Sequence, residues 1–382
     1  MRRPVERPRP GGQAAILPAG TAHLARALLT VNLGAVRENY RLLKSKLGGT
    51  ACAGVVKADG YGLGADKVAR ALQAEGCDTF FVALASEGIS LRRALGPAPT
   101  IYVLNGVAPG AEEAVARAGL VAVLNSLDQL AAWAEAGKRL GKKLPAALQV
   151  DSGMSRLGMA PAEVEALARD AGLLAGIELK LVMSHLACAD EPTHPANAAQ
   201  LAAFRTLRAK LPAAPASLAN SSGIFLGPEY HFDLARPGAA LYGINPTPGS
   251  NNPMRAVVTL RAKVVQTREV PAGAAIGYGP AATAAEPKRL ATISLGYADG
   301  WQRRAGAAAW FDGKRLPFIG RVSMDSIILD VSSVPAGVLK TGDLVSLIDG
   351  EHGVDDAAVA AGTIGYEVLT GLGSRFERTY TG

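Results

Sequence analysis

The stretch AGVVKADGYGLG, residues 53–64, carries the most information in this chain of 382 residues. An uninterrupted apolar run is typical of a strand buried on both faces, which places Lys57 at the C-terminal end of that strand. Barrels built from βα units keep their reactive groups at this end. A desolvated lysine loses part of its preference for the charged form, and a neutral amine can attack an aldehyde to form a Schiff base. The alternative for Lys57 is a side chain that extends from the strand end into water.

Short apolar segments alternate with amphipathic helical patterns from residue 51 to about residue 245. The helical patterns cover 65–76, 126–140 and 161–172, and Ser126 and Pro161 are typical helix-start residues. Eight strand–helix units over this span predict a (β/α)8 barrel. A doubly wound sheet is the alternative, but no GxGxxG motif follows the first strand. The eight candidate strands are 51–57, 79–85, 100–106, 121–125, 146–151, 178–185, 216–220 and 232–235.

The pattern changes after about residue 250, where strands alternate with turns. Asp312-Gly313 lies between two strand-like runs and indicates a hairpin. The apolar segment 27–33 is surplus to the eight barrel strands, and we expect it to pair with the C-terminal sheet. The predicted fold is therefore α/β, an N-terminal (β/α)8 barrel followed by a mainly β C-terminal domain. The expected divisions are a disordered Pro/Arg-rich tail at 1–21, a strand at 22–34 that pairs with the C-terminal domain, the barrel at 35–248 and the β domain at 249–382.

Composition limits the possible partners and compartments. The chain has 40 Lys and Arg against 33 Asp and Glu, a net charge of +7, but no basic run alternates with aromatic residues. Nucleic-acid binding is therefore not expected, and an anionic small ligand fits better. Cys52, Cys77 and Cys188 lie far apart without metal-ligand spacing, so we expect reduced cysteines and no metal. The longest apolar stretch of the first twenty residues, 14–17, is too short for a signal-peptide core, and no segment is typical of a membrane span, so we expect a cytoplasmic protein.

The loops after the seventh and eighth strands carry polar residues suited to a phosphate. ASLANSSG places Asn220 and Ser221 after the seventh strand, and DLARPGAALYG places Arg236 after the eighth. Backbone N–H groups of these two loops form the usual phosphate site of barrels. On spacing alone, Ser221 as a helix cap and Arg236 as a surface ion-pair residue are equally good interpretations.

Two more side chains are expected at the same end of the barrel. Arg156, in VDSGMSRLG, lies just beyond the fifth strand, and His185, in MSHLACAD, ends the sixth. A histidine at such a position is often a satisfied core residue, which is the alternative for His185.

Eight motifs, taken together and in order, resemble the alanine racemases, which use pyridoxal 5'-phosphate to interconvert L- and D-alanine. The resemblance runs from about residue 22 to the end of the chain. It implies that Lys57 is the Schiff-base lysine and that Tyr278 is the opposing base. The motifs are VVKADGYGLGA, VDSGMSRLGM, ANSSG, RPGAALYG, IGYG, LGYADGW, GRVSMD and TIGYEVLT.

The resemblance also implies which residues contact the cofactor and the substrate. Arg156 is expected near the ring hydroxyl, Arg236 at the pyridine nitrogen and His185 in the network around Tyr278. The implied cofactor contacts are Lys57, Tyr61, Arg156, His185, Asn220, Ser221, Arg236, Gly238, Ala239 and Tyr366, of which Tyr61, Ser221, Gly238, Ala239 and Tyr366 surround the phosphate. The implied substrate contacts are Arg156, Tyr297 and Met324, with the Met324 N–H facing the carboxylate and Asp325 in a structural role.

Racemisation explains the need for two bases. A proton leaves one face of Cα and another returns to the opposite face, so a lysine and a tyrosine on opposite faces can share the work. In this family the tyrosine belongs to one subunit and the lysine to the other, which implies a head-to-tail homodimer. The implied function is the supply of D-alanine for peptidoglycan.

One departure from the family concerns Gln149, where some members carry a carbamylated lysine whose negative charge positions the residue equivalent to Arg156. A neutral glutamine cannot supply that charge, so we expect no carbamate; a chloride-like anion or a glutamine hydrogen bond would orient Arg156 instead. Three functional alternatives remain open: a broader-specificity or serine racemase of the same fold, an amino-acid decarboxylase with the same two domains, and a one-domain pyridoxal-phosphate carrier protein. The 249–382 segment argues against the carrier.

Overall fold

The computed structural model describes residues 26–303 and 307–382, which form two compact units. Unit 1 contains the described residues before Asn32 together with Val258–Tyr380, and unit 2 contains Asn32–Val257 and the last two residues. The predicted tail at 1–21 lies outside the described residues. Residues 249–257, assigned to the β domain from the sequence, group with the barrel; Asn252 Nδ2, for example, donates to the Gly243 carbonyl at 2.8 Å.

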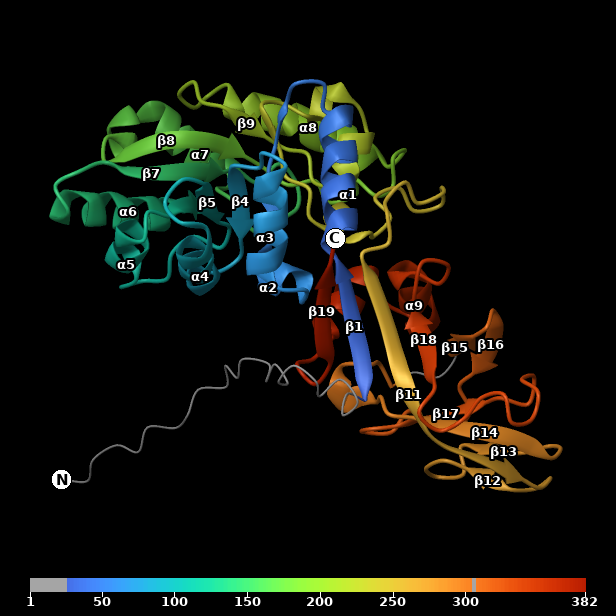
Figure 1. Cartoon of the computed structure of the whole chain (residues 1–382). Coiled ribbons are helices and arrows are strands. Elements are labelled where there is room, and N and C mark those ends of the chain that lie inside the picture. The colour runs from blue at the N-terminus through green and yellow to red at the C-terminus, as the bar shows by residue number, and fades with distance from the viewer. Residues whose placement is uncertain (1–25, 304–306) are drawn as a thin grey trace, which may run out of the picture. The chain divides into compact units, whose positions relative to one another are not determined.

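Unit 2 is built on a parallel sheet whose seven strands follow chain order (Figure 1). Every residue of β6 is buried, as expected of strands covered on both faces. The strands are β3 (Gly54–Val55), β4 (Thr79–Val82), β5 (Thr100–Val103), β6 (Val121–Leu124), β7 (Leu144–Gln149), β8 (Ile177–Met183) and β9 (Ala216–Ser217).

An eighth strand closes this sheet into a barrel. β10 (Leu234–Ala235) pairs in parallel with β2 (Ala51–Cys52), which directly precedes β3. On its other side, the N–H of Arg236 donates to the Ala219 carbonyl at 2.9 Å and so joins β10 to the segment after β9. The predicted (β/α)8 barrel is confirmed, with β2 and β3 together forming the first strand.

Helices connect the strands of unit 2, with start signals that match the sequence. Ser126 caps α6 by accepting the Gln129 N–H at 3.2 Å, and Pro161 is the first residue of α7. The helices are α1 (Leu33–Lys46), α2 (Lys57–Tyr61), α3 (Ala65–Ala74), α4 (Ala85–Leu95), α5 (Glu112–Arg117), α6 (Leu127–Arg139), α7 (Pro161–Arg169) and α8 (Pro195–Arg208), with 3₁₀ turns η2 (Ala171–Leu174), η3 (Ser222–Phe225), η4 (Pro228–Tyr230) and η5 (Ala239–Tyr242).

Unit 1 is mainly β and contains a sheet in the order β16-β15-β18-β11-β1-β19, with β14 paired to β11 and β17 paired to β14. β11, the long yellow strand of Figure 1, lies antiparallel to β1, so the apolar segment near the N-terminus lies inside this sheet. The strands are β1 (Ala27–Asn32), β11 (Val258–Val270), β14 (Lys288–Ile293), β15 (Ala308–Phe311), β16 (Lys314–Pro317), β17 (Ile327–Asp330), β18 (Leu344–Ile348) and β19 (Glu377–Thr381).

The remaining elements of unit 1 are short. The predicted hairpin is confirmed: Asp312 and Gly313 have φ of 47° and 71° between β15 and β16, as a two-residue turn of this kind requires. The other elements are β12 (Ala275–Ile276), β13 (Ala282–Thr283), the 3₁₀ turn η6 (Tyr297–Asp299), α9 (Val354–Ala361) and α10 (Gly365–Gly371).

All three cysteines are free, and Cys52 and Cys77 are buried. Within residues 26–303 and 307–382, no helix combines the length and the apolar character that a membrane crossing requires.

Candidate active site

Lys57 begins a left-handed turn at the carboxyl end of the first barrel strand. The strand ends at Val55, earlier than the predicted 51–57, and residues 58–61 all have φ between 53° and 63°. Such backbone costs an L-residue roughly 1–2 kcal/mol, so it persists only where other contacts hold it. One such contact is the Asp59 carboxylate, which accepts the Ala65 N–H at 2.9 Å.

The Glu87 carboxylate is a second contact on this turn. Its Oε1 accepts the N–H of Ala58 at 2.8 Å, and its Oε2 accepts the N–H of Ala83 at 2.8 Å and of Leu84 at 3.1 Å. The sequence analysis missed Glu87. Its position in the first turn of α4 allows its carboxylate to accept the N–H of the N-cap residue Leu84, but that position does not reveal the bond to Ala58.

The surroundings of Lys57 lower the pKa of its amine. Its side chain is half-buried, and this burial is the main cause that lowers its pKa below the ordinary value. The positive charges of Arg156 and Arg236 lower the pKa further, while the carboxylate of Glu87 raises it. The predicted lysine therefore lies within electrostatic reach of both predicted arginines.

Arg236 is buried, with only 4% of its surface exposed. Its Nη2 donates to the Ser184 carbonyl at 2.6 Å and its Nη1 donates to Ser217 Oγ. Burial lowers the pKa of its guanidinium to about 9. The interpretation of Arg236 as a surface ion-pair residue is wrong, because its partners are neutral oxygen atoms at the ends of neighbouring strands.

His185 lies two residues beyond β8, which ends at Met183 rather than at the predicted residue 185, and it is half-buried. Burial, followed by the charges of Arg236, Arg156 and Lys57, lowers its pKa to about 3, so its imidazole is neutral at physiological pH. Gln200, on α8, fixes the backbone here: its Nε2 donates to the His185 carbonyl at 2.9 Å.

The loops after β9 and β10 meet through Ser221. Its Oγ accepts the N–H groups of Gly238 at 3.0 Å and Ala240 at 3.2 Å. Ser221 precedes η3, but its side chain does not cap that turn: Asn220 accepts the Gly223 N–H at 2.9 Å, and the Ser221 hydroxyl bonds to the start of η5 instead. The Ser221 hydroxyl therefore joins the two loops that were predicted to bind a phosphate, and holds them together.

Gly238 makes room at this surface for Tyr61. A Cβ added at Gly238 would lie 2.3 Å from Tyr61 Oη, closer than any real contact. Tyr61 is buried and stacks on Tyr242 with ring centroids 4.5 Å apart. The structure therefore brings Tyr61, Ser221, Gly238 and Ala239 together.

Asp151 shapes the loop that carries Arg156. Its Oδ1 accepts the N–H groups of Gly153 and Met154, each at 2.9 Å. Burial alone would raise the pKa of this carboxyl, but the backbone hydrogen bonds outweigh it and lower the pKa. Gln149 is buried at the end of β7, and no hydrogen bond joins it to Arg156 within the described chain, so the glutamine bond considered for Arg156 is not present.

Four predicted residues belong to unit 1 and have exposed side chains: Tyr278, Tyr297, Met324 and Tyr366. Tyr278 is exposed to 71% and lies in the turn between β12 and β13, flanked by Gly277 and Gly279 with φ of 74° and 64°. Glycine adopts this backbone without strain, so the turn can project the tyrosine outward.

Arg375 ties together the two segments that carry Tyr297 and Met324. Its guanidinium contacts Asp299 Oδ1 at 3.1 Å and Asp325 Oδ1 at 2.7 Å. The segments also share backbone bonds, since the Tyr297 N–H donates to the Ser323 carbonyl at 3.1 Å. The sequence analysis missed Arg375, which follows the segment in which the motifs were identified.

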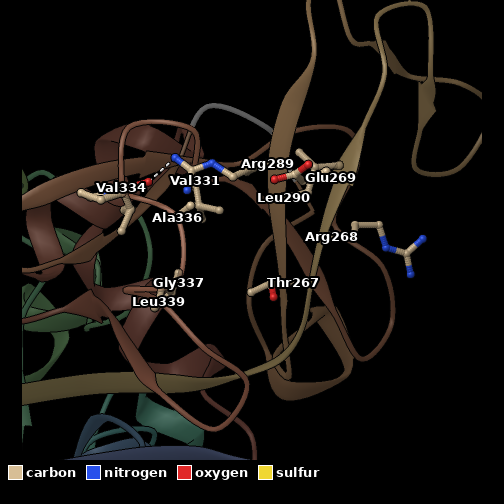
Figure 2. Close-up of a pocket in the computed structure, with 11 residues that line it drawn as sticks. Thr267, Arg268, Glu269, Arg289, Leu290, Val331, Val334, Ala336, Gly337 and Leu339 are labelled. Atoms are coloured by element: carbon tan, nitrogen blue, oxygen red, sulfur yellow. Dashed lines mark hydrogen bonds between the residues drawn. The ribbon is translucent and has the colours of Figure 1, made fainter.

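A groove of about 230 Å³ in unit 1 is separate from these residues (Figure 2). Arg289 donates to the Val334 carbonyl at its edge, and the Arg268 side chain points away from it. None of the predicted site residues lines this groove. The lining residues are Thr267, Arg268, Glu269, Arg289, Leu290, Val331, Val334, Pro335, Ala336, Gly337 and Leu339. The groove is therefore not the candidate active site.

The cluster in unit 2 fits an anionic aldehyde cofactor such as pyridoxal phosphate. Lys57 supplies an amine with a lowered pKa, and Arg156 and Arg236 supply positive charge nearby. The glycine at position 238 leaves the space beside Tyr61 that a Cβ would fill. Among the described residues, no group of three His, Cys, Asp or Glu side chains could hold a metal ion.

Comparison with known proteins agrees with this geometry. Residues 31–246 match the family model described as alanine racemase, N-terminal domain. Residues 257–380 match the model described as alanine racemase, C-terminal domain.

Individual relatives match along most of their length. A protein of Mesorhizobium japonicum named "alanine racemase, catabolic" is 67% identical over 358 residues, covering 94% of each chain. One of Rhodospirillum rubrum named alanine racemase is 50% identical, covering 94% of this chain and 96% of the relative. The crystal structure of alanine racemase from Bartonella henselae, with covalently bound pyridoxal phosphate, has a TM-score of 0.90 at 42% identity, covering 93% of this chain and 99% of its own.

Proposed function

This chain belongs to the alanine racemase family, and from that premise we propose that it inverts alanine at Cα with two bases, Lys57 and Tyr278. One observation carries the proposal. Lys57 has a lowered pKa, at the carboxyl end of a barrel strand and within reach of two arginine charges.

The cofactor of this reaction is pyridoxal phosphate. When bound, it draws electron density from Cα of the amino acid and so makes the Cα proton acidic. Lys57 would hold it covalently, and the linked loops of Ser221 and Gly238 would bind its phosphate beside Tyr61. Ala239 and Tyr366 are the other residues that the resemblance assigns to the phosphate, and Asn220 is assigned to the cofactor more generally.

The two proposed bases divide the proton transfers. A neutral Lys57 amine can take the Cα proton on one face, while the Tyr278 hydroxyl gives a proton on the other, and the reverse reaction exchanges their roles. The lowered pKa of Lys57 supports its part, since an amine must be neutral to accept a proton.

Arg236 would direct the outcome of the reaction. Its guanidinium is held by Ser184 and Ser217, so a positive charge stays fixed where we place the ring nitrogen. A second positive charge on that nitrogen would be disfavoured, which limits the electron sink and shortens the time for protonation at the wrong carbon.

We propose that Arg156, Tyr297 and the Met324 N–H contact the substrate, while His185 belongs to the network around Tyr278. A broader-specificity or serine racemase of the same fold is the alternative.

We further propose a homodimer in which Tyr278 of one subunit completes the site of Lys57 in the other. Support comes from the family resemblance and from the high exposure of Tyr278. Mixing a Lys57→Ala chain with a Tyr278→Ala chain should restore activity, because each heterodimer contains one native site. Absence of any recovery after subunit exchange, verified by mass spectrometry, would contradict the shared site.

The direct test incubates purified protein and pyridoxal phosphate with a panel of L-amino acids, followed by chiral analysis. We expect D-alanine to form fastest, with deuterium from D₂O appearing at Cα, and Lys57→Ala to abolish both. Inversion of serine as fast as alanine would overturn the substrate assignment.

The physiological direction has two candidates. The supply of D-alanine for peptidoglycan is the proposal from the sequence, whereas relatives at 67% and 52% identity are named catabolic. Deleting the gene in its host distinguishes them: a requirement for D-alanine indicates biosynthesis, and loss of growth on alanine as carbon source indicates breakdown. The cytoplasmic location stays a prediction, to be checked by cell fractionation.

A further inference from the structure

We propose that Glu87 is a positioning residue for the catalytic lysine, acting through the backbone of the left-handed turn that Lys57 begins. The inference rests on the proposed function, because it takes Lys57 as one of the two bases. Glu87 itself touches neither substrate nor cofactor in this proposal.

The geometry of the Glu87 carboxylate carries the proposal. One oxygen holds the N–H of Ala58, the residue directly after Lys57, and the other holds the N–H groups of Ala83 and Leu84 at the end of β4. The peptide that follows Lys57 is thus attached to the neighbouring barrel strand. Charge-assisted hydrogen bonds of this kind are stronger than neutral ones.

The left-handed turn makes this attachment necessary. Ala58, directly after Lys57, is the first residue of the turn with left-handed backbone, and its φ of 53° is unfavourable for an alanine. If its N–H were released, the peptide could rotate toward an ordinary conformation. The Cα–Cβ bond of Lys57 would rotate with it, and the amine would leave its place among Arg156 and Arg236.

Charge is the second contribution of Glu87. The charged groups that act on Lys57 in the described chain are Arg156, Arg236 and Glu87, and only the last is negative. Removing its charge would leave two positive charges unopposed and would lower the pKa of the lysine still further.

The chain offers a matched control in Glu163. This residue occupies the same position at the start of α7: Oε2 accepts the Ala160 N–H and Oε1 accepts the Leu127 N–H from another segment, each at 2.9 Å. Both glutamates are half-buried and each joins a helix start to a second segment. Only Glu87 holds the residue next to Lys57.

The test compares Glu87→Gln, Glu87→Asp and Glu163→Gln with the wild-type holoenzyme. Three measurements are made on each variant: kcat and KM for alanine, the fall of kcat on the acid side of its pH profile (the acid limb), which reports the lysine in the substrate complex, and the rate of cofactor release followed by absorbance after dilution. Urea unfolding of the two glutamine variants checks that they lose comparable stability.

For Glu87→Gln we expect kcat to fall about tenfold or more, because small misplacement of a reacting group has large effects. The acid limb of the pH profile should move to lower pH, because the pKa of Lys57 falls when the negative charge is removed. The cofactor should leave several-fold faster. Glu87→Asp keeps the charge with a shorter reach, so its acid limb should return toward wild type while kcat stays low. Glu163→Gln should match wild type in all three.

Equal kcat, acid limb and cofactor release in Glu87→Gln and Glu163→Gln would overturn the proposal. If Glu87→Gln does not fold, the test rests on Glu87→Asp. A wild-type kcat and a wild-type rate of cofactor release in Glu87→Asp would then overturn the proposal. Failure of the proposed function is a separate result, since wild type and Glu163→Gln would then lack racemase activity.

Discussion

The guanidinium of Arg236 donates a 2.6 Å hydrogen bond to the backbone carbonyl of Ser184 and thereby joins the ends of two barrel strands. Ser184 directly follows β8, and Arg236 directly follows β10. Ser217, in β9 between them, accepts a second bond from the same guanidinium. One buried cation at the end of β10 is therefore held by the ends of the two preceding strands, which fixes the position of its charge.

We predict that Arg236→Gln lowers the racemisation rate tenfold or more and raises the formation of pyruvate by transamination. Removal of the fixed positive charge allows protonation of the ring nitrogen and lengthens the life of the electron-rich state. Racemisation is followed by chiral analysis and pyruvate by a coupled lactate dehydrogenase assay.

Arg92→Gln is the control for this prediction. Arg92 is half-buried and also bonds backbone carbonyls, at Gly96 and Pro99, but it lies outside the candidate site. A rise in the ratio of pyruvate to racemised alanine in both variants would contradict the role of Arg236.

The close approach of Gly238 and Tyr61 predicts that Gly238→Ala weakens cofactor binding about tenfold. The new Cβ would meet Tyr61 Oη at 2.3 Å, so the tyrosine or the loop must move, and overpacking of this kind costs about 1–3 kcal/mol. Fluorescence titration with pyridoxal phosphate measures the change. Gly350→Ala is the control, because a Cβ there meets nothing within 4 Å, and equal affinities of the two variants would disprove the steric argument.

Arg375→Ala should raise KM for alanine several-fold with a smaller effect on kcat. The ion pairs to Asp299 and Asp325 hold the segments of Tyr297 and Met324, to which we assign substrate contacts. An interaction that binds the substrate equally well in the ground state and in the transition state affects KM rather than kcat, so its loss raises KM. Arg375 is 43% exposed, so the free energy of unfolding should fall by only about 1 kcal/mol or less.

Steady-state kinetics and urea unfolding check this prediction, with Arg268→Ala as the control, because Arg268 is not assigned to the substrate and its guanidinium donates to Gln266 Oε1 at 2.5 Å. An unchanged KM in Arg375→Ala would show that the ion pairs do not position the substrate contacts.

The lowered pKa of His185 predicts a specific pH dependence of stability. Folded His185 has a pKa of about 3, whereas an unfolded histidine has a pKa near 6.5, so between these values the unfolded chain binds the proton. The contribution of His185 to the free energy of unfolding is therefore complete above about pH 6.5 and declines as the pH falls toward 3. His185→Gln should lose less stability than wild type between pH 7 and pH 5, as measured by urea unfolding. Parallel losses in the two proteins would show that His185 titrates normally.

The barrel could be predicted because its information is local. Each βα unit shows its own apolar run and its own helix signals, such as the Ser126 cap and Pro161 at the start of α7. The hairpin at Asp312-Gly313 is likewise encoded by two adjacent residues.

Contacts between distant segments could not be predicted in this way. The sequence identifies Ser221 and Arg236 as candidates, but only the fold shows that Ser221 joins two loops and that Arg236 is buried. Glu87 was missed because its importance comes from one bond to Ala58, in a segment that precedes its own helix. Local periodicity also gave no sign that the backbone turns left-handed after Lys57.

The position of β1 has a consequence for synthesis of the chain. β1 emerges early from the ribosome, yet it pairs with β11, which is made only after the whole of unit 2, and with β19 at the very end. At roughly 5–20 residues per second, this interval is on the order of ten to fifty seconds. During that time β1 is an apolar strand with two unpaired edges, and such edges can pair with other nascent chains. The barrel can fold first, but β1 must be protected until β11 has been made.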